Sequence, residues 1–340
     1  MRRNFLKNAL AAALTLSLSL SGAQVLAQAK VIKISHQFPG GTIDEGDFRD
    51  RLVRKFAAEV EKKSNGQLKF EIYPAASLMK AVPQYKALST GALDMSLYPL
   101  AYAGGEFPEA NLTLMPAVIT SYEQGLRWKD ALIGKELMRL LEERNVKIIT
   151  WIWQAGGIAS KGKPVVSPDD AKGMKVRGGS REMDLMIKAA GGAVTNVASN
   201  EIYSAMQSGV LDAALTSSTS LISFRLHETS NFLTTGRKHS FWFMFEPLLM
   251  SKKSFDALTP AQQKLVVEVG ASLEKFGMEA ARADDQRVVD VYLKAGHKVN
   301  DMEKEAFDKW REVAKNSAWK DFEEKVKNGK QLFDMALSVK

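Results

Sequence analysis

Short segments of alternating apolar and polar residues are separated by segments in which apolar residues recur every three or four positions. The alternating segments 31–35 and 68–73 are predicted to be β-strands, because successive side chains of a strand point to opposite faces of its sheet. Between them, residues 48–63 carry apolar side chains at four-residue spacing, which predicts a helix. A short helix over 82–90 and a strand over 92–98 follow. This order is typical of an open, mainly parallel sheet.

The second half of the chain repeats this order of elements. We predict strands over 146–153, 174–176, 193–197 and 210–216, and helices over 180–190 and 200–208. Residues 87–98 and 205–216 also match each other, since each runs from a helix end through glycine and aspartate into an apolar strand. Glycine suits a helix end that needs a positive φ. The match favours two similar α/β lobes over coincidence, although helix–glycine–strand is a common sequence.

Polar side chains end several of these predicted strands. Ligands of such sheets bind beyond the carboxyl ends of the strands, so Tyr98 and Thr216 are expected to face the space between the lobes. Arg177 ends another strand, just before a helix that begins near Ser180. A guanidinium offers two parallel donors that match a carboxylate, and a helix N-terminus adds a positive dipole end. Arg177 is therefore a candidate carboxylate-binding residue, with a surface salt bridge as the alternative.

The C-terminal third is predicted to be mainly helical. A helix over 260–296 begins after a threonine cap and a proline, with a possible kink near Gly277, and further helices occupy about 301–314 and 317–337. A helix of that length can brace two lobes, or it can be an ordinary packing helix.

The first residues predict export. Arg2, Arg3 and Lys7 precede an uncharged run and then Val25-Leu26-Ala27, which is interpreted as a cleavage pattern that ends in the small residue Ala27. This order is found in a secretory signal peptide, here over residues 1–27. The apolar run is too short to span a bilayer. The chain contains no cysteine, which excludes disulfides, thiolate nucleophiles and cysteine-metal sites.

The distribution of charge and the absence of catalytic motifs argue against two classes of protein, nucleic-acid-binding proteins and secreted hydrolases. Three of the eight net positive charges lie in the predicted leader, and the others are not clustered, so a nucleic-acid surface is not expected. A secreted hydrolase would need a nucleophile, a base and an orienting group together. The sequence has neither a Gly-x-Ser-x-Gly elbow nor a His-Glu-x-x-His pair, and its four histidines are scattered. His36 is interpreted as a structural residue.

Several segments, in this order and spacing, resemble the DctP family of periplasmic solute receptors from TRAP transporters. The resemblance covers nearly all of the chain after residue 27 and rests on Lys33-Ile34-Ser35-His36, Phe56-Ala57-Ala58-Glu59-Val60, Ser64-Asn65-Gly66, Tyr73-Pro74-Ala75-Ala76-Ser77-Leu78, Gly91-Ala92-Leu93-Asp94, Ser167-Pro168-Asp169-Asp170, Lys172-Gly173-Met174-Lys175-Val176-Arg177 and Glu201-Ile202-Tyr203-Ser204-Ala205-Met206-Gln207-Ser208-Gly209-Val210-Leu211-Asp212.

The resemblance implies an α/β, two-lobe periplasmic binding protein of type II-like fold, with central mixed sheets, a hinge and a long C-terminal bracing helix. It implies that the lobes close over an organic acid and deliver it to the permease subunits of a TRAP transporter, without an enzymatic reaction. The expected division is lobe I over 28–153 plus about 243–282, and lobe II over 154–242 plus about 283–340. Arg177 matches the arginine that binds the ligand carboxylate in the family. The protein is expected to be a monomer. A binding protein that is coupled to a sensor rather than to transport shares the same fold and is an alternative function.

Departures from the family pattern bear on the ligand. Many members carry a second arginine where this chain has Gly157, and others carry a glutamate and an asparagine where Leu215 and Thr216 stand. A buried anion without a partner is costly, so we predict a single bound carboxylate: a 2-oxo, 2-hydroxy or aromatic monocarboxylate. Gln154 resembles the glutamine of 2-oxo-acid receptors, in which it also helps to hold a cation. Leu215 cannot serve as the second ligand there, so neither a metal nor a cofactor is expected.

Aromatic and amide side chains near the expected cleft complete the predicted site. About half of the side chains of an alternating strand face inward, so only two or three aromatic residues of this set are expected to touch the ligand. The selected candidates beside Arg177, Gln154 and Thr216 are Tyr98, Trp153, Phe243, Trp242, Gln37 and Phe38.

Overall fold

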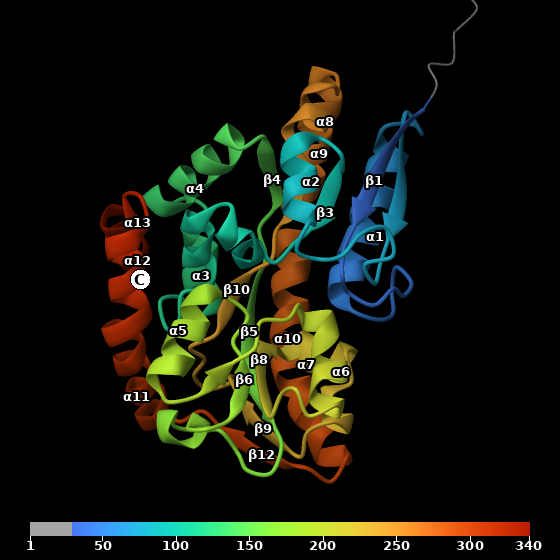
Figure 1. The fold of residues 1–340 in the computed structure, drawn as a ribbon. Helices are drawn as coiled ribbons and strands as arrows, with labels where there is room; N and C mark the ends of the chain where they lie inside the picture. Colours follow the sequence, from blue (N-terminus) through green and yellow to red (C-terminus); the bar gives the residue numbers. More distant parts are fainter. Residues whose placement is uncertain (1–28) are drawn as a thin grey trace, which may run out of the picture.

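The computed structural model describes residues 29–340 and shows two α/β lobes, each built on one mixed sheet. Figure 1 shows the lobes one above the other, joined by a long helix that runs through both. The predicted fold class is therefore confirmed. The predicted signal peptide lies outside the described residues. None of the helices within 29–340 is long and apolar enough to cross a membrane.

Lobe I contains a five-stranded sheet in the order β2-β1-β3-β11-β4. Its strands are β1 (Lys30–Ser35), β2 (Leu68–Tyr73), β3 (Met95–Leu97), β4 (Val146–Thr150) and β11 (Leu248–Ser251). β1 runs parallel to β2 and β3, whereas β11 runs antiparallel to β3 and β4. Burial of Ile32 and Ile34 follows the alternation that predicted β1, because these side chains point into the core.

Lobe II contains a seven-stranded sheet in the order β12-β9-β5-β8-β6-β7, with β10 paired to β5. Its strands are β5 (Trp153–Ser160), β6 (Lys175–Arg177), β7 (Ala193–Val194), β8 (Ala213–Ser217), β9 (Phe232–Thr235), β10 (Phe243–Phe245) and β12 (Lys298–Asp301). β6 is parallel to both β7 and β8, and β5 is antiparallel to β8 and β9. The predicted single strand over 146–153 is in fact β4 and the start of β5, which belong to different sheets.

Helices cover both sheets. They are α1 (Phe48–Lys63), α2 (Gln84–Thr90), α3 (Tyr122–Trp128), α4 (Leu132–Glu143), α5 (Arg181–Ala189), α6 (Ile202–Gln207), α7 (Ser218–Ser223) and α8 (Lys252–Asp256). Two 3₁₀ segments, η1 (Leu100–Gly105) and η2 (Pro108–Leu114), follow β3, and shorter ones occupy 168–171, 199–201 and 226–228. α1 has the predicted bounds, because Asp47 caps its first turn and its apolar face is buried in lobe I.

The internal repeat predicted from the sequence has the same geometry in both lobes. Gly91 and Gly209 follow α2 and α6 with φ of 74° and 75°, the left-handed conformation that glycine adopts without strain. Asp94 Oδ2 then accepts from the backbone N–H of Lys33 over 2.9 Å, and Asp212 Oδ2 accepts from that of Lys175 over 2.8 Å. Each aspartate thus fixes the neighbouring parallel strand, β1 in lobe I and β6 in lobe II.

The long helical segment joins the lobes as α9 (Pro260–Ser272) and α10 (Glu274–Lys294). α9 contacts β4 and α1 of lobe I, and α10 contacts β5 and α7 of lobe II. The interruption falls at Leu273, so the expected kink near Gly277 is wrong. Gly277 is instead a packing position, where an added Cβ would lie 3.2 Å from Leu52 and 3.3 Å from Ile152.

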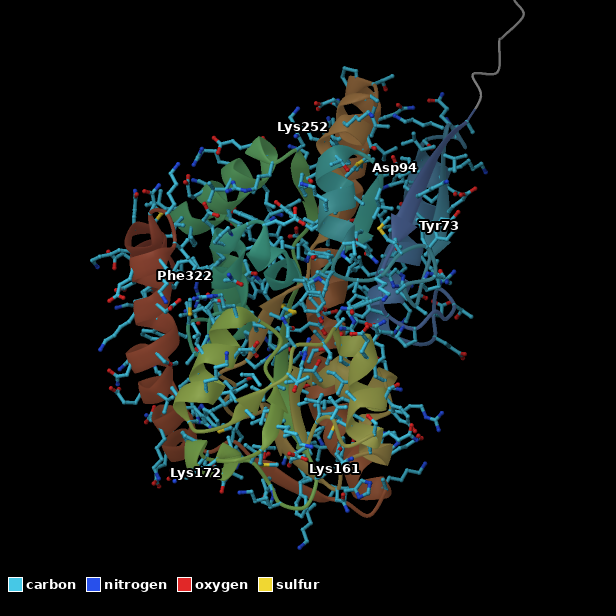
Figure 2. The ribbon with its side chains drawn as sticks, in the orientation of Figure 1. Tyr73, Asp94, Lys161, Lys172, Lys252 and Phe322 are labelled. Carbon is cyan, nitrogen blue, oxygen red and sulfur yellow. The ribbon has the colours of Figure 1, made fainter. Side chains whose placement is uncertain are left out.

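The C-terminal helices run along one side of both lobes (Figure 1). They are α11 (Lys304–Ala314), α12 (Lys320–Lys325) and α13 (Gly329–Leu337), with a π-helical turn over Lys315–Trp319. The predicted helix over 317–337 is therefore two helices, because Val326 is extended and Asn328 has a positive φ. Figure 2 marks Phe322 on this side, with Asp94 in lobe I and Lys172 at the far end of lobe II. Phe322 packs against Phe333, which holds the last two helices together.

Candidate functional site

Arg177 lies at the end of β6, between β7 and β8. Val176 is buried in the sheet, and the strand stops because Gly178 and Gly179 follow, the latter with φ of 100°. α5 begins directly afterwards, and the hydroxyl of its N-cap Ser180 accepts from the N–H of Met183. The sequence thus delivers a long cationic side chain to the edge of the sheet, next to the start of a helix.

The guanidinium of Arg177 is almost completely buried, with 1% of the residue exposed. Nε donates to Val197 O over 3.1 Å, Nη1 to Leu215 O over 2.8 Å and Nη2 to the hydroxyl of Tyr102 over 2.8 Å. Because a guanidinium has five N–H donors, one N–H on each terminal nitrogen is left over. Two such donors are the set that a carboxylate accepts in a bidentate pair.

A carboxylate behind Arg177 influences the charge of the site. Burial raises the pKa of Asp184 on α5 to about 6, although the positive charge of Arg177 acts in the opposite direction. Asp184 therefore takes up or releases a proton close to neutral pH. An anion that binds to Arg177 will encounter the charge of Asp184 above this pKa.

Tyr102 brings lobe I into contact with Arg177. It lies in η1, and its hydroxyl also accepts from the backbone N–H of Ser199 in lobe II over 2.9 Å. Sequence reasoning selected Tyr98 instead, four residues earlier. The hydroxyl of Tyr98 is already used to donate to Val82 O over 3.0 Å, and its ring packs edge-on against that of Tyr102 at 6.1 Å.

A partly open cavity of about 230 Å³ lies next to Tyr102 at the junction of the lobes. Its lining comes from η1, η2 and the segment before α2 in lobe I and from the segments after β6 and β7 in lobe II: Val82, Ala101, Tyr102, Gly104, Gly105, Asn111, Gly179, Ser180, Arg181, Asn196, Val197 and Ala198. Arg181 is half exposed and is already paired with Asp321 and Glu182. The cavity offers space for a small molecule beside the buried guanidinium.

Thr216 and Trp242 lie in the same part of lobe II as Arg177. Thr216 follows the carbonyl of Leu215 that Arg177 contacts, and it pairs with Gly157 across β5. The indole N–H of Trp242 donates to Gly178 O over 3.1 Å, directly after Arg177. The structure therefore brings together these three predicted residues.

Gln154 and Phe38 belong to a second buried group, centred on Arg49. The guanidinium of Arg49 lies 3.6 Å above the ring of Phe38 and contacts Asp47, Glu246, Ser217 and Ser220. Gln154 Nε2 donates to Glu246. Sequence reasoning missed Arg49, because the segment 48–51 resembles the charged start of any helix, and its partners are far away in the chain.

Arg49 has two buried carboxylate partners in this second group, Asp47 and Glu246. Burial raises the pKa of Asp47, but Arg49 outweighs this effect and holds the pKa below its usual value. Burial also raises the pKa of Glu246, despite Arg49. Five hydrogen bonds engage Arg49, and three of them share the two N–H groups of Nη1. Only one N–H, on Nη2, is therefore left for a ligand, so Arg49 cannot offer one free N–H on each terminal nitrogen. Gln37, the neighbour of Phe38, has both side-chain amide atoms buried without a partner within the described residues.

Trp153 and Phe243 pack toward helix α3 of lobe I. The ring of Trp153 is edge-on to Trp128 at 5.1 Å and tilted against Phe245 at 5.0 Å. Phe243 is edge-on to Tyr122 at 5.3 Å. These contacts account for the burial of both rings at the crossing between the lobes.

The histidine and carboxylate side chains of the described residues do not gather into a metal site. Within 29–340, no three His, Asp or Glu side chains come together as metal ligands. His36 Nε2 lies 3.1 Å from Asp50 Oδ1, fully buried under α1. His36 thus has a structural contact of the kind expected for it.

Similarity to known proteins agrees with this arrangement. The family model of bacterial extracellular solute-binding proteins, family 7 (DctP), matches residues 42–325. The chain belongs to the DctP family. Members of this family bind solutes and are not enzymes, and the structural relative below is a TRAP periplasmic protein, as the sequence resemblance implied.

Individual relatives of this DctP-family chain span most of its length. A solute-binding protein of Albidiferax ferrireducens is 57% identical over 325 residues, which cover 96% of this chain and 95% of the relative. The C4-dicarboxylate-binding periplasmic protein DctP of Rhodobacter capsulatus is 27% identical, with 90% of each chain covered. A TRAP periplasmic solute-binding protein from Rhodoferax ferrireducens, solved with bound malonate, has 58% identity and a TM-score of 0.89, and covers 91% of this chain and 98% of its own.

Proposed function

We propose that this protein is the extracytoplasmic receptor of a TRAP transporter and binds a small organic acid through Arg177. The proposal rests on the buried guanidinium of Arg177 at the lobe junction, in which each terminal nitrogen has one N–H that makes no hydrogen bond within the described residues. A carboxylate satisfies both donors at once and neutralises the buried charge. The lobes close around the acid by a hinge movement and present it to membrane permease subunits.

We further propose that the ligand is a monocarboxylate with a 2-oxo, 2-hydroxy or aromatic group. A side chain at position 157 has no room, since an added Cβ would lie 2.5 Å from Thr234 O. The side chain of Leu215 is apolar and buried. Arg49 already forms ion pairs with two carboxylates, Asp47 and Glu246. These three facts support Arg177 as the single fixed cation that has two free N–H donors for a ligand. The cavity of about 230 Å³ has a volume that suits a small acid.

A short dicarboxylate is the second candidate, because the Rhodoferax ferrireducens relative holds malonate. In this chain, neutral donors would then have to hold the second carboxylate. Hydroxyl and amide groups around the cavity, such as Ser180 and Asn111, are the residues that would do so. A buried anion with neutral partners costs more than one paired with an arginine.

A thermal-shift panel tests both candidates. Pyruvate, lactate, benzoate, malonate, succinate and malate are added in turn to the wild type, Arg177→Ala and the control Arg139→Ala, whose arginine is paired with glutamates on the surface of α4. The wild type and the control are expected to gain stability from the same monocarboxylate, and Arg177→Ala to gain none. Stabilisation of Arg177→Ala by that acid would contradict the role of Arg177. Stabilisation by the dicarboxylates alone would contradict the monocarboxylate proposal.

Further proposals concern processing and partners. We propose a signal peptide over 1–27 and a periplasmic monomer, with lobe I over 28–153 plus about 243–282 and lobe II over 154–242 plus about 283–340. Strand β10 (Phe243–Phe245) lies at this boundary, because it pairs with β5 in the sheet of lobe II. The intact mass of the exported protein tests the cleavage of the signal peptide. Its mass in light scattering tests whether it is a monomer. Uptake of the identified acid by vesicles that contain TRAP permease subunits distinguishes transport from coupling to a sensor, since only a transport receptor supports uptake.

A further inference from the structure

The hydroxyl of Tyr102 joins the two lobes at Arg177. Tyr102 belongs to η1 of lobe I, whereas both groups that donate to its oxygen, Arg177 Nη2 at 2.8 Å and Ser199 N at 2.9 Å, belong to lobe II. A phenol oxygen has two lone pairs and carries one proton. Both lone pairs are therefore occupied, and within residues 29–340 the hydroxyl proton has no acceptor among the hydrogen bonds of Tyr102.

We propose that Tyr102 is a specificity and closure residue, which donates its proton to a carboxylate oxygen of the acid bound on Arg177. The inference rests on the proposed function, because it needs an acid at that arginine. Tyr102 and Arg177 Nη2 are already in contact, so an oxygen that accepts the free N–H of Nη2 lies next to the phenol. The acid then bridges lobe II, through Arg177, and lobe I, through Tyr102.

Gly179 lines the cavity and lies against the guanidinium of Arg177. An added Cβ at this position would lie 2.6 Å from Arg177 Nη1, and Gly179 lines the cavity together with Tyr102 and Val197. A side chain at this position would collide with the terminal nitrogen, and the φ of 100° is one that residues other than glycine rarely adopt. The proposed acid therefore enters from this cavity, next to the phenol, and the buried guanidinium becomes accessible to it as the lobes open.

Asn111 supplies a polar contact for the remainder of the acid. It lines the same cavity, is 2% exposed, and its Oδ1 has no partner within the described residues. A buried amide without a partner is unfavourable, and a ligand hydroxyl or oxo group can satisfy it, because the two amide atoms can exchange places by rotation.

The hydrogen-bond pattern defines the chemical class of the ligand. Arg177 and Tyr102 together present three donors and no free acceptor to the bound group. An ionised carboxylate contains only acceptors and fits this set, whereas a carboxamide would place its NH₂ group against a donor. We therefore expect the free acid to bind and its primary amide to be rejected.

Tyr102→Phe tests the proposal, because it removes the hydroxyl and keeps the ring. Titration calorimetry and stopped-flow release are measured with malonate, pyruvate, lactate and benzoate. The dissociation constant of the acid that binds is expected to rise about 10- to 100-fold, since hydrogen bonds to charged groups are lost, mainly through faster release. The matched control is Tyr203→Phe, whose hydroxyl contacts Glu228 on the surface of lobe II, and it should bind like the wild type.

A second readout needs no ligand. The chain has no cysteine, so Lys63→Cys in lobe I and Lys172→Cys in lobe II allow one spin label on each lobe. Tyr102→Phe should shift the distance distribution between the labels toward open forms without any acid, because both inter-lobe bonds to its oxygen are lost. The control Tyr203→Phe should leave the distribution unchanged.

The outcomes separate this inference from the proposed function. Wild-type binding and wild-type label distances in Tyr102→Phe would overturn the role of Tyr102. If Arg177→Ala has lost binding in that case, the receptor site itself still stands. If Arg177→Ala also binds like the wild type, the site at Arg177 is wrong as well. The label distances decide the closure role even if none of the four acids binds.

Discussion

β1 of lobe I and β6 of lobe II occupy equivalent places, yet only β6 ends in a cation. Both strands are held by the aspartate of the internal repeat, Asp94 or Asp212, through a backbone N–H of Lys33 or Lys175. Two residues after each lysine, Ser35 stands in lobe I where Arg177 stands in lobe II. The two lobes thus share a backbone frame, and one side chain creates the difference in charge.

The segments after the two strands differ as well. Residues 36–47 separate β1 from α1, whereas Gly178, Gly179 and Ser180 lead directly from β6 into α5. The short connection places the N-terminus of a helix beside Arg177, and the long one makes room for the buried group around Arg49. The repeated backbone frame thus sets where the strands of each lobe lie. The residue at the end of the strand and the length of the following loop determine what each lobe does.

The largest expected effect concerns the two strand ends themselves. Arg177→Lys keeps the charge but loses the planar pair of donors, so the affinity for the bound acid should fall at least about 30-fold. Ser35→Ala should change it less than about 2-fold, since a neutral hydroxyl contributes little net free energy here. Isothermal titration measures both. A comparable loss in Ser35→Ala would mean that both strand ends bind the acid.

The aspartates of the repeat come next. Asp94 Oδ1 also accepts from Ser254 Oγ over 2.5 Å, so Asp94→Ala should lower the free energy of unfolding by about 2 kcal/mol and Asp212→Ala by about 1 kcal/mol. Denaturant titration measures these values. Only Asp212→Ala should also weaken acid binding, because it loosens the strand that carries Arg177. Equal effects on binding would contradict separate tasks for the two strands.

The glycines of the repeat should give a smaller effect. Alanine in the left-handed conformation costs about 1 kcal/mol, so Gly209→Ala, which faces open space, should lower the unfolding free energy by that amount. Gly91→Ala should cost more, because its Cβ would lie 2.6 Å from Lys253 Cδ, a flexible side chain that has to move. A smaller loss in Gly91→Ala than in Gly209→Ala would show that the two turns are not equivalent.

The smallest effect concerns Asp184, in the first turn of the helix that follows Arg177. Burial raises its pKa to about 6, so it is protonated at pH 5 and anionic at pH 8. An anion near Arg177 disfavours a second one, and wild-type affinity for a monocarboxylate should therefore fall a few-fold as the pH rises from 5 to 8. Asp184→Asn should show a weaker pH dependence across this range, and what remains is expected from Glu182 on the same helix, whose pKa burial raises to about 7. A wild-type affinity independent of pH would contradict the coupling.

The sequence predicted what depends on local pattern. α1, β2 and the repeat have their expected places, because period and glycine turns are local signals. Arg49 was missed, since its importance arises from Glu246 and Ser217, which are distant in sequence. Tyr98 was preferred to Tyr102 because η1 was not foreseen, and a 3₁₀ turn decides which of the two phenols faces Arg177. The lining of the cavity comes from two lobes, and no single segment reveals it.

The path of the C-terminal helices affects how a conformational reporter should be built. α11 contacts α5 of lobe II, but α13 returns to α4 of lobe I, and Val339 O accepts from Gln124 at the start of α3. β1, the first described strand, also belongs to lobe I. Although residues 283–340 as a whole are proposed to belong to lobe II, their C-terminal end is thus held against lobe I. Fluorophores fused to the two ends would therefore both travel with lobe I and hardly change their separation when the lobes close. One fluorophore has to be inserted into a surface turn of lobe II, such as the turn at Gly162, to follow the movement.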